Sequence, residues 1–147
     1  MMNRLLAKTA LGVLVMDLAL KHLPLGAERV LIPGVLALSY ARNTGVAFGL
    51  LSGKPVLSFG LAALLIAAGS WALTRLPLSR FESLCAGLIL GGALGNLIDR
   101  VIYGAVHDYL RFLWIDFPVF NLADIAVTTG AVLLMSRLLF SGRKEAA

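Results

Sequence analysis

The stretch GLILGGALGNLIDR, residues 87–100, decides the fold that the sequence predicts. Glycines recur in it every four residues, at Gly87, Gly91 and Gly95, and two more small residues, Gly92 and Ala93, follow Gly91. Residues at this spacing share one face of a helix, and a face with almost no side chains lets a neighbouring helix approach closely. The stretch ends on a polar edge made of Asn96, Asp99 and Arg100. We therefore expect this edge to lie close to a second helix.

The composition around this stretch is that of a membrane protein. Of 147 residues, 59% are hydrophobic and 14% are charged, and the mean hydropathy is +0.89, whereas soluble domains are about 45–50% apolar and about 25% charged. Four apolar stretches have nearly the ~20 residues that cross a bilayer: 5–20, 56–73, 84–98 and 122–140. We expect an all-α membrane protein with four transmembrane helices in a single domain, residues 1–147.

The basic residues predict the orientation. An even number of spans places both termini on one side, which would carry Arg4, Lys8, Arg75, Arg80, Arg137, Arg143 and Lys144. Short segments rich in Lys and Arg favour the cytoplasm. The first stretch resembles a signal peptide, but it lacks an A-x-A cleavage site and contains Asp17, so we expect a retained helix. The outer side then holds Asp99, Asp108, Asp116 and Asp124.

Net charge and cysteine content exclude other classes of protein. The net charge is +5, but the 13 basic residues are scattered between apolar runs, so anionic lipids are the expected partners and nucleic acid is not. The single cysteine, Cys85, allows no disulfide framework or thiolate metal cluster within the chain.

Two segments between the predicted spans are unusually apolar for loops. VLIPGVL, residues 30–36, is typical of two short strands that turn at Pro33 and Gly34. YLRFLWI, residues 109–115, is rich in aromatic residues, which favour the membrane interface. We expect both segments to lie on the membrane surface.

Two aspartates are candidates for acid–base chemistry. Asp124 begins an apolar span three residues after Asn121, where a carboxylate costs about 2.5–3.5 kcal/mol on insertion scales; capping the helix and a functional role can coexist there. Asp108 lies in GAVHDYL, residues 104–110, a largely apolar segment able to place it opposite Asp124. Two close carboxylates do not ionise together, so one keeps a proton while the other activates water.

A metal site and a serine nucleophile are weaker interpretations. His107, Asp108 and Asp124 could ligate a metal, but neighbours in an extended segment point to opposite faces, and no H-E-x-x-H motif is present. The only histidines are His22 and His107, and no serine lies in a nucleophile-elbow motif.

Four blocks of sequence together resemble the lipoprotein signal peptidases, membrane aspartic peptidases that cut bacterial prolipoproteins. The blocks are DLALK (17–21), RNTGVAFG (42–49), GGALGNLIDR (91–100), and GAVHD (104–108) followed by FNLAD (120–124). The resemblance implies four membrane helices, a small periplasmic β-cradle and an interfacial periplasmic helix. It implies Asp108 and Asp124 as the catalytic dyad, with no metal and no cofactor. Residues that it implies as lining or bracing the site are Asn43, Asn96, Arg100 and Asn121, with Asp17 and Asp99 as structural supports.

The resemblance also implies a substrate and a location. The substrate is a prolipoprotein whose cysteine already carries diacylglycerol, cut on the amino side of that cysteine. Globomycin-type cyclic peptides are implied as inhibitors, the bacterial inner membrane as the location, and an active site near its periplasmic face in what we expect to be a monomer. His107, Tyr109 and Leu18 depart from the usual family residues; a histidine that touches the dyad would shift its pH dependence.

Two other classes of function compete with a peptidase. In a small proton-coupled membrane carrier, Asp17, Asp108 and Asp124 would relay protons, although the discontinuous helices and repeated halves of carriers are not evident. A non-catalytic assembly module would use the glycine face alone and leave the clustered outer aspartates unexplained.

Overall fold

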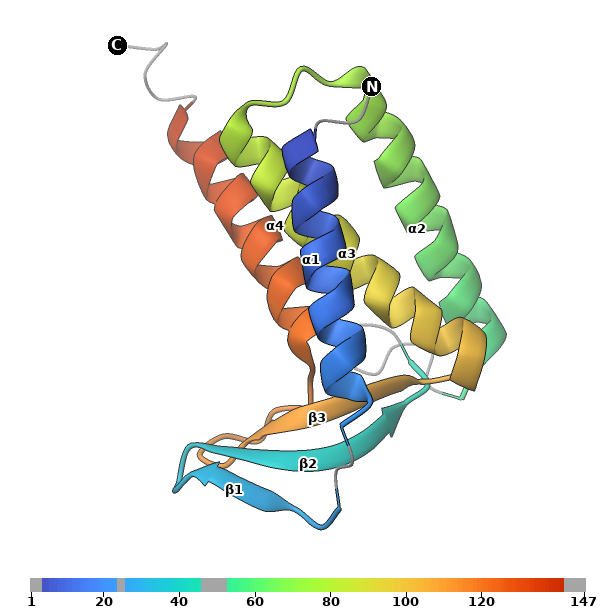
Figure 1. Cartoon of the computed structure of the whole chain (residues 1–147), viewed down its shortest axis with the longest axis vertical. Coiled ribbons are helices and arrows are strands. Elements are labelled where there is room, and N and C mark those ends of the chain that lie inside the picture. The colour runs from blue at the N-terminus through green and yellow to red at the C-terminus, as the bar shows by residue number, and fades with distance from the viewer. Residues whose placement is uncertain (1–3, 24–25, 46–52, 142–147) are drawn as a thin grey trace.

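Four helices form a bundle that stands on a small sheet in the computed structural model, which describes residues 4–23, 26–45 and 53–141 (Figure 1). The elements follow in the order α1 (Arg4–Lys21), β1 (Arg29–Ile32), β2 (Leu36–Asn43), α2 (Pro55–Arg75), α3 (Arg80–Tyr103), β3 (Val106–Phe112) and α4 (Leu122–Ser141). All four predicted helices are present. The third helix is longer than predicted, because Ser79 and Glu82 form a capping box at its start and Gly104, at φ 68°, ends it.

The glycine face of α3 packs against α1 as predicted. A Cβ on Gly91 would lie 2.5 Å from the backbone oxygen of Ala10, and one on Gly87 would lie 2.8 Å from the backbone oxygen of Leu6. Gly92 faces α4 instead, where a Cβ would lie 2.5 Å from the backbone oxygen of Ala123. Any side chain at these positions would push the helices apart, so α3 is the central helix of the bundle.

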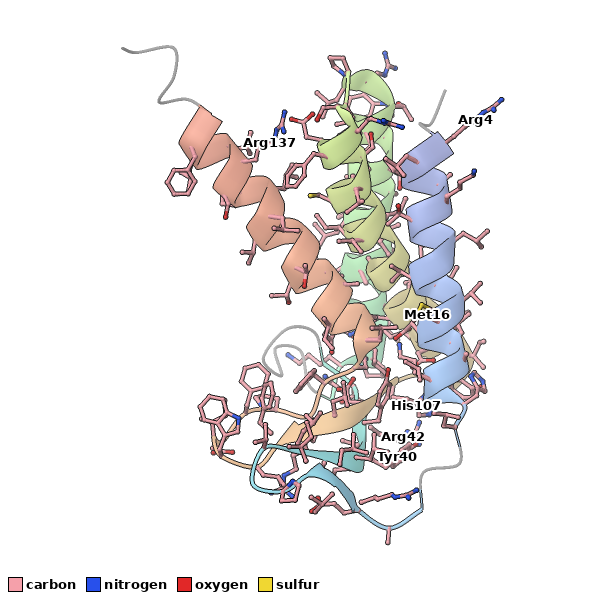
Figure 2. All side chains as sticks on the ribbon, turned by 60° about the vertical axis from the view of Figure 1, so that its left-hand side comes forward. Arg4, Met16, Tyr40, Arg42, His107 and Arg137 are labelled. Atoms are coloured by element: carbon pink, nitrogen blue, oxygen red, sulfur yellow. The ribbon has the colours of Figure 1, made fainter. Side chains whose placement is uncertain are left out.

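Three of the four helices are long and apolar enough to cross a membrane: α2, α3 and α4. The 18-residue α1 carries four charged residues, Arg4, Lys8, Asp17 and Lys21. The start of α1 and the end of α4 both lie at the end of the bundle away from the sheet (Figure 1). Arg4 and Arg137 mark that end, and Tyr40, Arg42 and His107 mark the sheet end (Figure 2).

The sheet is antiparallel, with strand order β1-β2-β3. The predicted strand pair at 30–36 is confirmed, since the chain turns through Gly34 at φ 71° and the Val35 N–H donates to the Ile32 carbonyl at 3.0 Å. Between residues 104 and 121, Val106–Phe112 form β3, which pairs along β2, and this described segment contains no interfacial helix. Residues 46–52, which include the end of the RNTGVAFG block, lie outside the described residues.

Candidate active site

The first turn of α4 is held by side chains from three other parts of the chain. Asn121 and Asp124 form a reciprocal cap: the Asp124 N–H donates to Asn121 Oδ1 at 2.9 Å, and the Asn121 N–H donates to Asp124 Oδ2 at 3.2 Å. The Ala123 N–H donates to Asp17 of α1 at 3.0 Å, and the Leu122 N–H donates to the Tyr109 hydroxyl of β3 at 3.1 Å. The orphan amides of the helix start are thereby satisfied, and the position of Asp124 is fixed.

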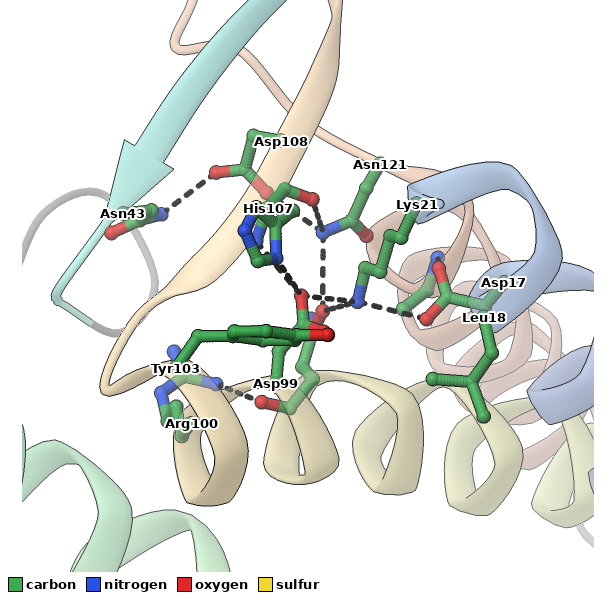
Figure 3. Close-up of polar contacts among 12 residues, drawn as sticks. Asp17, Leu18, Lys21, Asn43, Asp99, Arg100, Tyr103, His107, Asp108 and Asn121 are labelled. Carbon is green, nitrogen blue, oxygen red and sulfur yellow. Dashed lines mark hydrogen bonds and ion pairs between the residues drawn. The ribbon is translucent and has the colours of Figure 1, made fainter. Parts of the chain in front are cut away.

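Asp108 reaches the same place from β3. Its side chain is buried, with a residue exposure of 2%, and lies between two amides (Figure 3). Asn43 Nδ2 donates to Oδ2 at 3.1 Å, and Asn121 Nδ2 donates to Oδ1 at 2.7 Å. Burial, together with the negative charge of Asp124, raises the pKa of Asp108 to about 7. The Asp108 carboxyl is therefore poised to hold or release a proton near neutral pH.

Both carboxyl groups line one cavity of about 530 Å³ between the bundle and the loop before α4. Asn43, Asn96 and Arg100 also line it. The rest of the wall is mostly apolar and comes from α2, α3, β3, α4 and residues 117–120: Leu61, Ala62, Leu65, Ile66, Ala93, Val106, Phe117, Pro118, Val119, Phe120, Val127 and Thr128. The predicted convergence of two distant aspartates on one hollow is therefore what the structure shows.

The predicted Asn96 and Arg100 share a face of α3 that meets this cavity. Asn96 Nδ2 donates to Asp124 Oδ1 at 2.8 Å. Arg100 donates to the backbone carbonyls of Asn96, at 3.1 Å, and of Gly45. A guanidinium held by carbonyls places a fixed positive charge at the cavity without neutralising either aspartate through a direct bond.

Asp17 and Asp99 lie outside the cavity wall and hold a lysine that the sequence reasoning missed. Lys21 has a fully buried side chain, with its Nζ 2.8 Å from Asp17 Oδ2 and 3.4 Å from Asp99 Oδ2 (Figure 3). A Cβ on Gly95 would lie 2.2 Å from the Asp17 carboxylate, so the last glycine of the face makes room for this group. A lysine four residues after an aspartate in an apolar helix was the available signal.

His107 does not turn its ring to the dyad. Its Nδ1 lies 3.2 Å from Asp99 Oδ2, and its ring packs edge-on against Tyr103 at 4.7 Å. Only its backbone carbonyl reaches the site, where it accepts from Asn121 Nδ2 at 3.3 Å. The imidazole therefore does not touch Asp108 directly, because adjacent residues of β3 point to opposite faces. Within the described ranges, no three His, Cys, Asp or Glu side chains are grouped as metal ligands are.

Known proteins are similar to this chain along nearly its whole length. The pattern of the Signal peptidase (SPase) II family matches residues 9–140. The Lipoprotein signal peptidase of Syntrophomonas wolfei is 49% identical, over 80% of this chain and 78% of that protein. The protein of the same name from Symbiobacterium thermophilum is 44% identical, over 86% and 85% respectively.

Two solved structures of bacterial membrane enzymes share the fold of this chain. A bacterial membrane enzyme determined by the in meso method at 2.3 Å resolution superposes with a TM-score of 0.84 at 31% identity, over 93% of this chain and 88% of that one. A second, at 1.9 Å resolution, gives a TM-score of 0.78, also at 31% identity, over 91% and 92%. The chain belongs to the signal peptidase II family and is a transmembrane protease.

Proposed function

We propose that this protein is an aspartic endopeptidase that removes signal peptides from diacylglyceryl-modified prolipoproteins, cutting on the amino side of the lipidated cysteine. The observation that carries the proposal is the cavity of about 530 Å³ that Asp108 and Asp124 line together. The names of the relatives support prolipoproteins as substrates. The mostly apolar wall suits a lipid-modified substrate better than a soluble peptide.

The environments of the two carboxyl groups suit different roles. Asp108 has a pKa raised to about 7 by burial and by the charge of Asp124, so it holds the proton below neutral pH. Asp124 accepts from Asn96 Nδ2 and from the Asn121 N–H, and these donors hold its carboxylate beside the cavity that it lines. Because the proton is assigned to Asp108, the Asp124 carboxylate acts as the base.

The reaction then needs only these two groups and water. Asp124 takes a proton from a water molecule as the water oxygen bonds to the scissile carbonyl carbon, while the Asp108 proton moves to the carbonyl oxygen. Asp124 then gives its proton to the amide nitrogen as the C–N bond breaks, and Asp108 takes the hydroxyl proton back as the carbonyl re-forms, which restores the dyad. Arg100 stabilises the negative charge that develops at the cavity.

The charge distribution supports an active site near the periplasmic face of the inner membrane. Arg4 and Arg137 mark the end of the bundle away from the sheet (Figure 2), and by the positive-inside tendency that end, with both termini, is cytoplasmic. Exposed apolar side chains of the sheet and the following loop then meet the outer headgroups: Val30, Leu31, Ile32, Val35, Trp114 and Ile115.

We include α1 as a fourth span. At about 1.5 Å per residue its 18 residues reach about 27 Å, close to the about 30 Å of a bilayer core. The charges deep in it are Asp17 and Lys21, which pair at 2.8 Å, and paired charges cost less in lipid than isolated ones. We propose that the protein acts as a monomer and that the mostly apolar cavity binds globomycin-type cyclic peptides as inhibitors.

The test is cleavage by purified protein in detergent, with synthetic diacylglyceryl-modified prolipoprotein and the unlipidated peptide as separate substrates. We expect cleavage of the lipidated substrate alone, at the bond before the modified cysteine, and a loss of at least about a hundredfold in Asp108→Asn and in Asp124→Asn. Asp116→Asn is the matched control, because Asp116 is an exposed outer aspartate outside the cavity wall. Equal cleavage by all three variants would refute the mechanism, and a proton current with no cleavage would favour a carrier.

A further inference from the structure

The buried ammonium of Lys21 is connected to the carboxyl pair through one amide. We propose that Lys21 is a positioning residue, which holds the Asn96 side chain in the orientation that presents an N–H to Asp124. This inference rests on the proposed function, since it assigns a residue to the same site.

The Lys21 ammonium lies close to three oxygens, and it donates a hydrogen bond to the one that belongs to Asn96. Its Nζ lies 2.8 Å from Asp17, 3.4 Å from Asp99 and 2.8 Å from Asn96 Oδ1. The two carboxylates suffice to neutralise the buried charge. The hydrogen bond to the neutral Asn96 amide is not needed to neutralise the Lys21 charge. It does connect Lys21 to the cavity, because Asn96 lines the cavity and Lys21 does not.

The chemistry of lysine determines which end of the Asn96 amide faces it. An ammonium only donates hydrogen bonds, so the group of Asn96 that it touches has to be the oxygen. Asn121 Nδ2 donates to the same oxygen at 3.1 Å. With its oxygen engaged twice, Asn96 turns its NH₂ group to Asp124, and Nδ2 donates to Oδ1 at 2.8 Å. Without Lys21, the Asn96 oxygen keeps only the Asn121 donor, so the amide is held less firmly in this orientation.

The orientation matters because of what surrounds Asp124. The charged or titratable side chains that act on the site are Asp108 and Tyr109 from β3, Arg100 from α3 and Lys21 from α1, and α2 lines the cavity with apolar side chains only. Among the described residues, the side-chain donor to Asp124 Oδ1 is Asn96. A flipped amide would place an oxygen lone pair against the catalytic carboxylate and move it from the attacking water.

The experiment is a double-mutant cycle on the cleavage reaction. Lys21→Met, Asn96→Leu and the double variant are compared with the wild type for kcat, KM and thermal unfolding midpoint. Lys8→Met is the matched control, because it makes the same substitution on an exposed part of the same helix. We expect Lys21→Met to lower kcat at least about tenfold with KM within twofold, and the double variant to be no slower than the slower single variant.

Two results would overturn the proposal. One is a Lys21→Met enzyme with the kcat of Lys8→Met, and the other is losses that multiply in the double variant, since that shows Lys21 acting independently of Asn96. If Lys21→Met does not yield folded protein, Asn96→Asp decides. It keeps an oxygen for Lys21 but puts an oxygen in place of the donor to Asp124, so we expect a folded protein with kcat reduced at least about tenfold; an unchanged kcat would reject the inference.

These outcomes are distinct from failure of the proposed function. If the wild type and Lys8→Met do not cleave the lipidated substrate, the proposed function is wrong. If both cleave it and Asp124→Asn does not, but Lys21→Met matches the wild type, the function holds and Lys21 has no positioning role.

Discussion

Removing the Asn43 amide should move the alkaline limit of activity to higher pH. Asn43 Nδ2 donates to Asp108 Oδ2 at 3.1 Å and lowers the pKa of Asp108, working against burial and the charge of Asp124, which raise that pKa to about 7. Because the bond favours the charged form, Asn43→Leu favours the protonated one. A hydrogen bond to a charged group contributes about 1.5–3 kcal/mol, which corresponds to about 1–2 pH units.

The assay is the pH dependence of kcat/KM for diacylglyceryl-prolipoprotein cleavage between pH 5.5 and 9.5. We expect wild-type activity to fall above about pH 7, where Asp108 loses the proton that the proposed reaction requires. We expect the falling limb of Asn43→Leu to lie about 1–2 units higher, whatever the height of the curve. The control is Tyr40→Phe, an exposed position on the same strand. A limb that stays in place or moves to lower pH would refute the assignment of that limb to Asp108.

Three further predictions concern stability and the histidine. Gly91→Ala should destabilise the protein by about 2 kcal/mol or more, because its Cβ would lie 2.5 Å from a backbone oxygen of α1. The control is Gly69→Ala, which has open space around it in α2 and should raise the unfolding midpoint slightly. If both variants had the same unfolding midpoint, close packing of α3 against α1 would be contradicted. Asp108→Asn should be more stable than the wild type above pH 7, by up to about 4 kcal/mol. The raised pKa of Asp108 means that the wild type loses stability as the pH rises toward about 7, and Asn has no such loss. Thermal melts at pH 5 and pH 8 should show the stability difference between the two proteins growing with pH, and a constant difference would contradict the raised pKa. His107→Val should leave the falling limb of the pH–rate curve in place, since its ring contacts Asp99, and a shifted limb would show that the imidazole acts on the dyad.

The helices and the strand pair could be predicted because their signals are local. Glycines at intervals of four fix one face of α3 regardless of what packs there, and Pro33 with Gly34 marks a turn from neighbouring residues alone. The third helix begins at Arg80, four residues before the predicted start, because Ser79 and Glu82 form a capping box there. Local chemistry also predicted the cap that Asp124 forms at the start of its helix, and the same residue lines the cavity.

Contacts between distant residues could not be predicted in the same way. The strand β3 exists because it pairs with β2, about 65 residues away, and the sequence of residues 104–110 reads equally well as an irregular loop. The rotation of that strand decides that Asp108 faces the cavity and His107 faces Asp99. Lys21 was overlooked because its importance comes from Asn96, a residue 75 positions away.

The claim on which the account depends is that Asp108 and Asp124 act as one unit, and a double-mutant cycle on the cleavage rate tests it most directly. Asp108→Asn, Asp124→Asn and the variant with both changes are assayed with the same lipidated substrate, after matching their folded fractions. We expect each single change to lower kcat by at least about a hundredfold and the double change to lower it no further than the larger single loss. Losses that multiply, or substantial cleavage by either single variant, would contradict a shared-proton dyad.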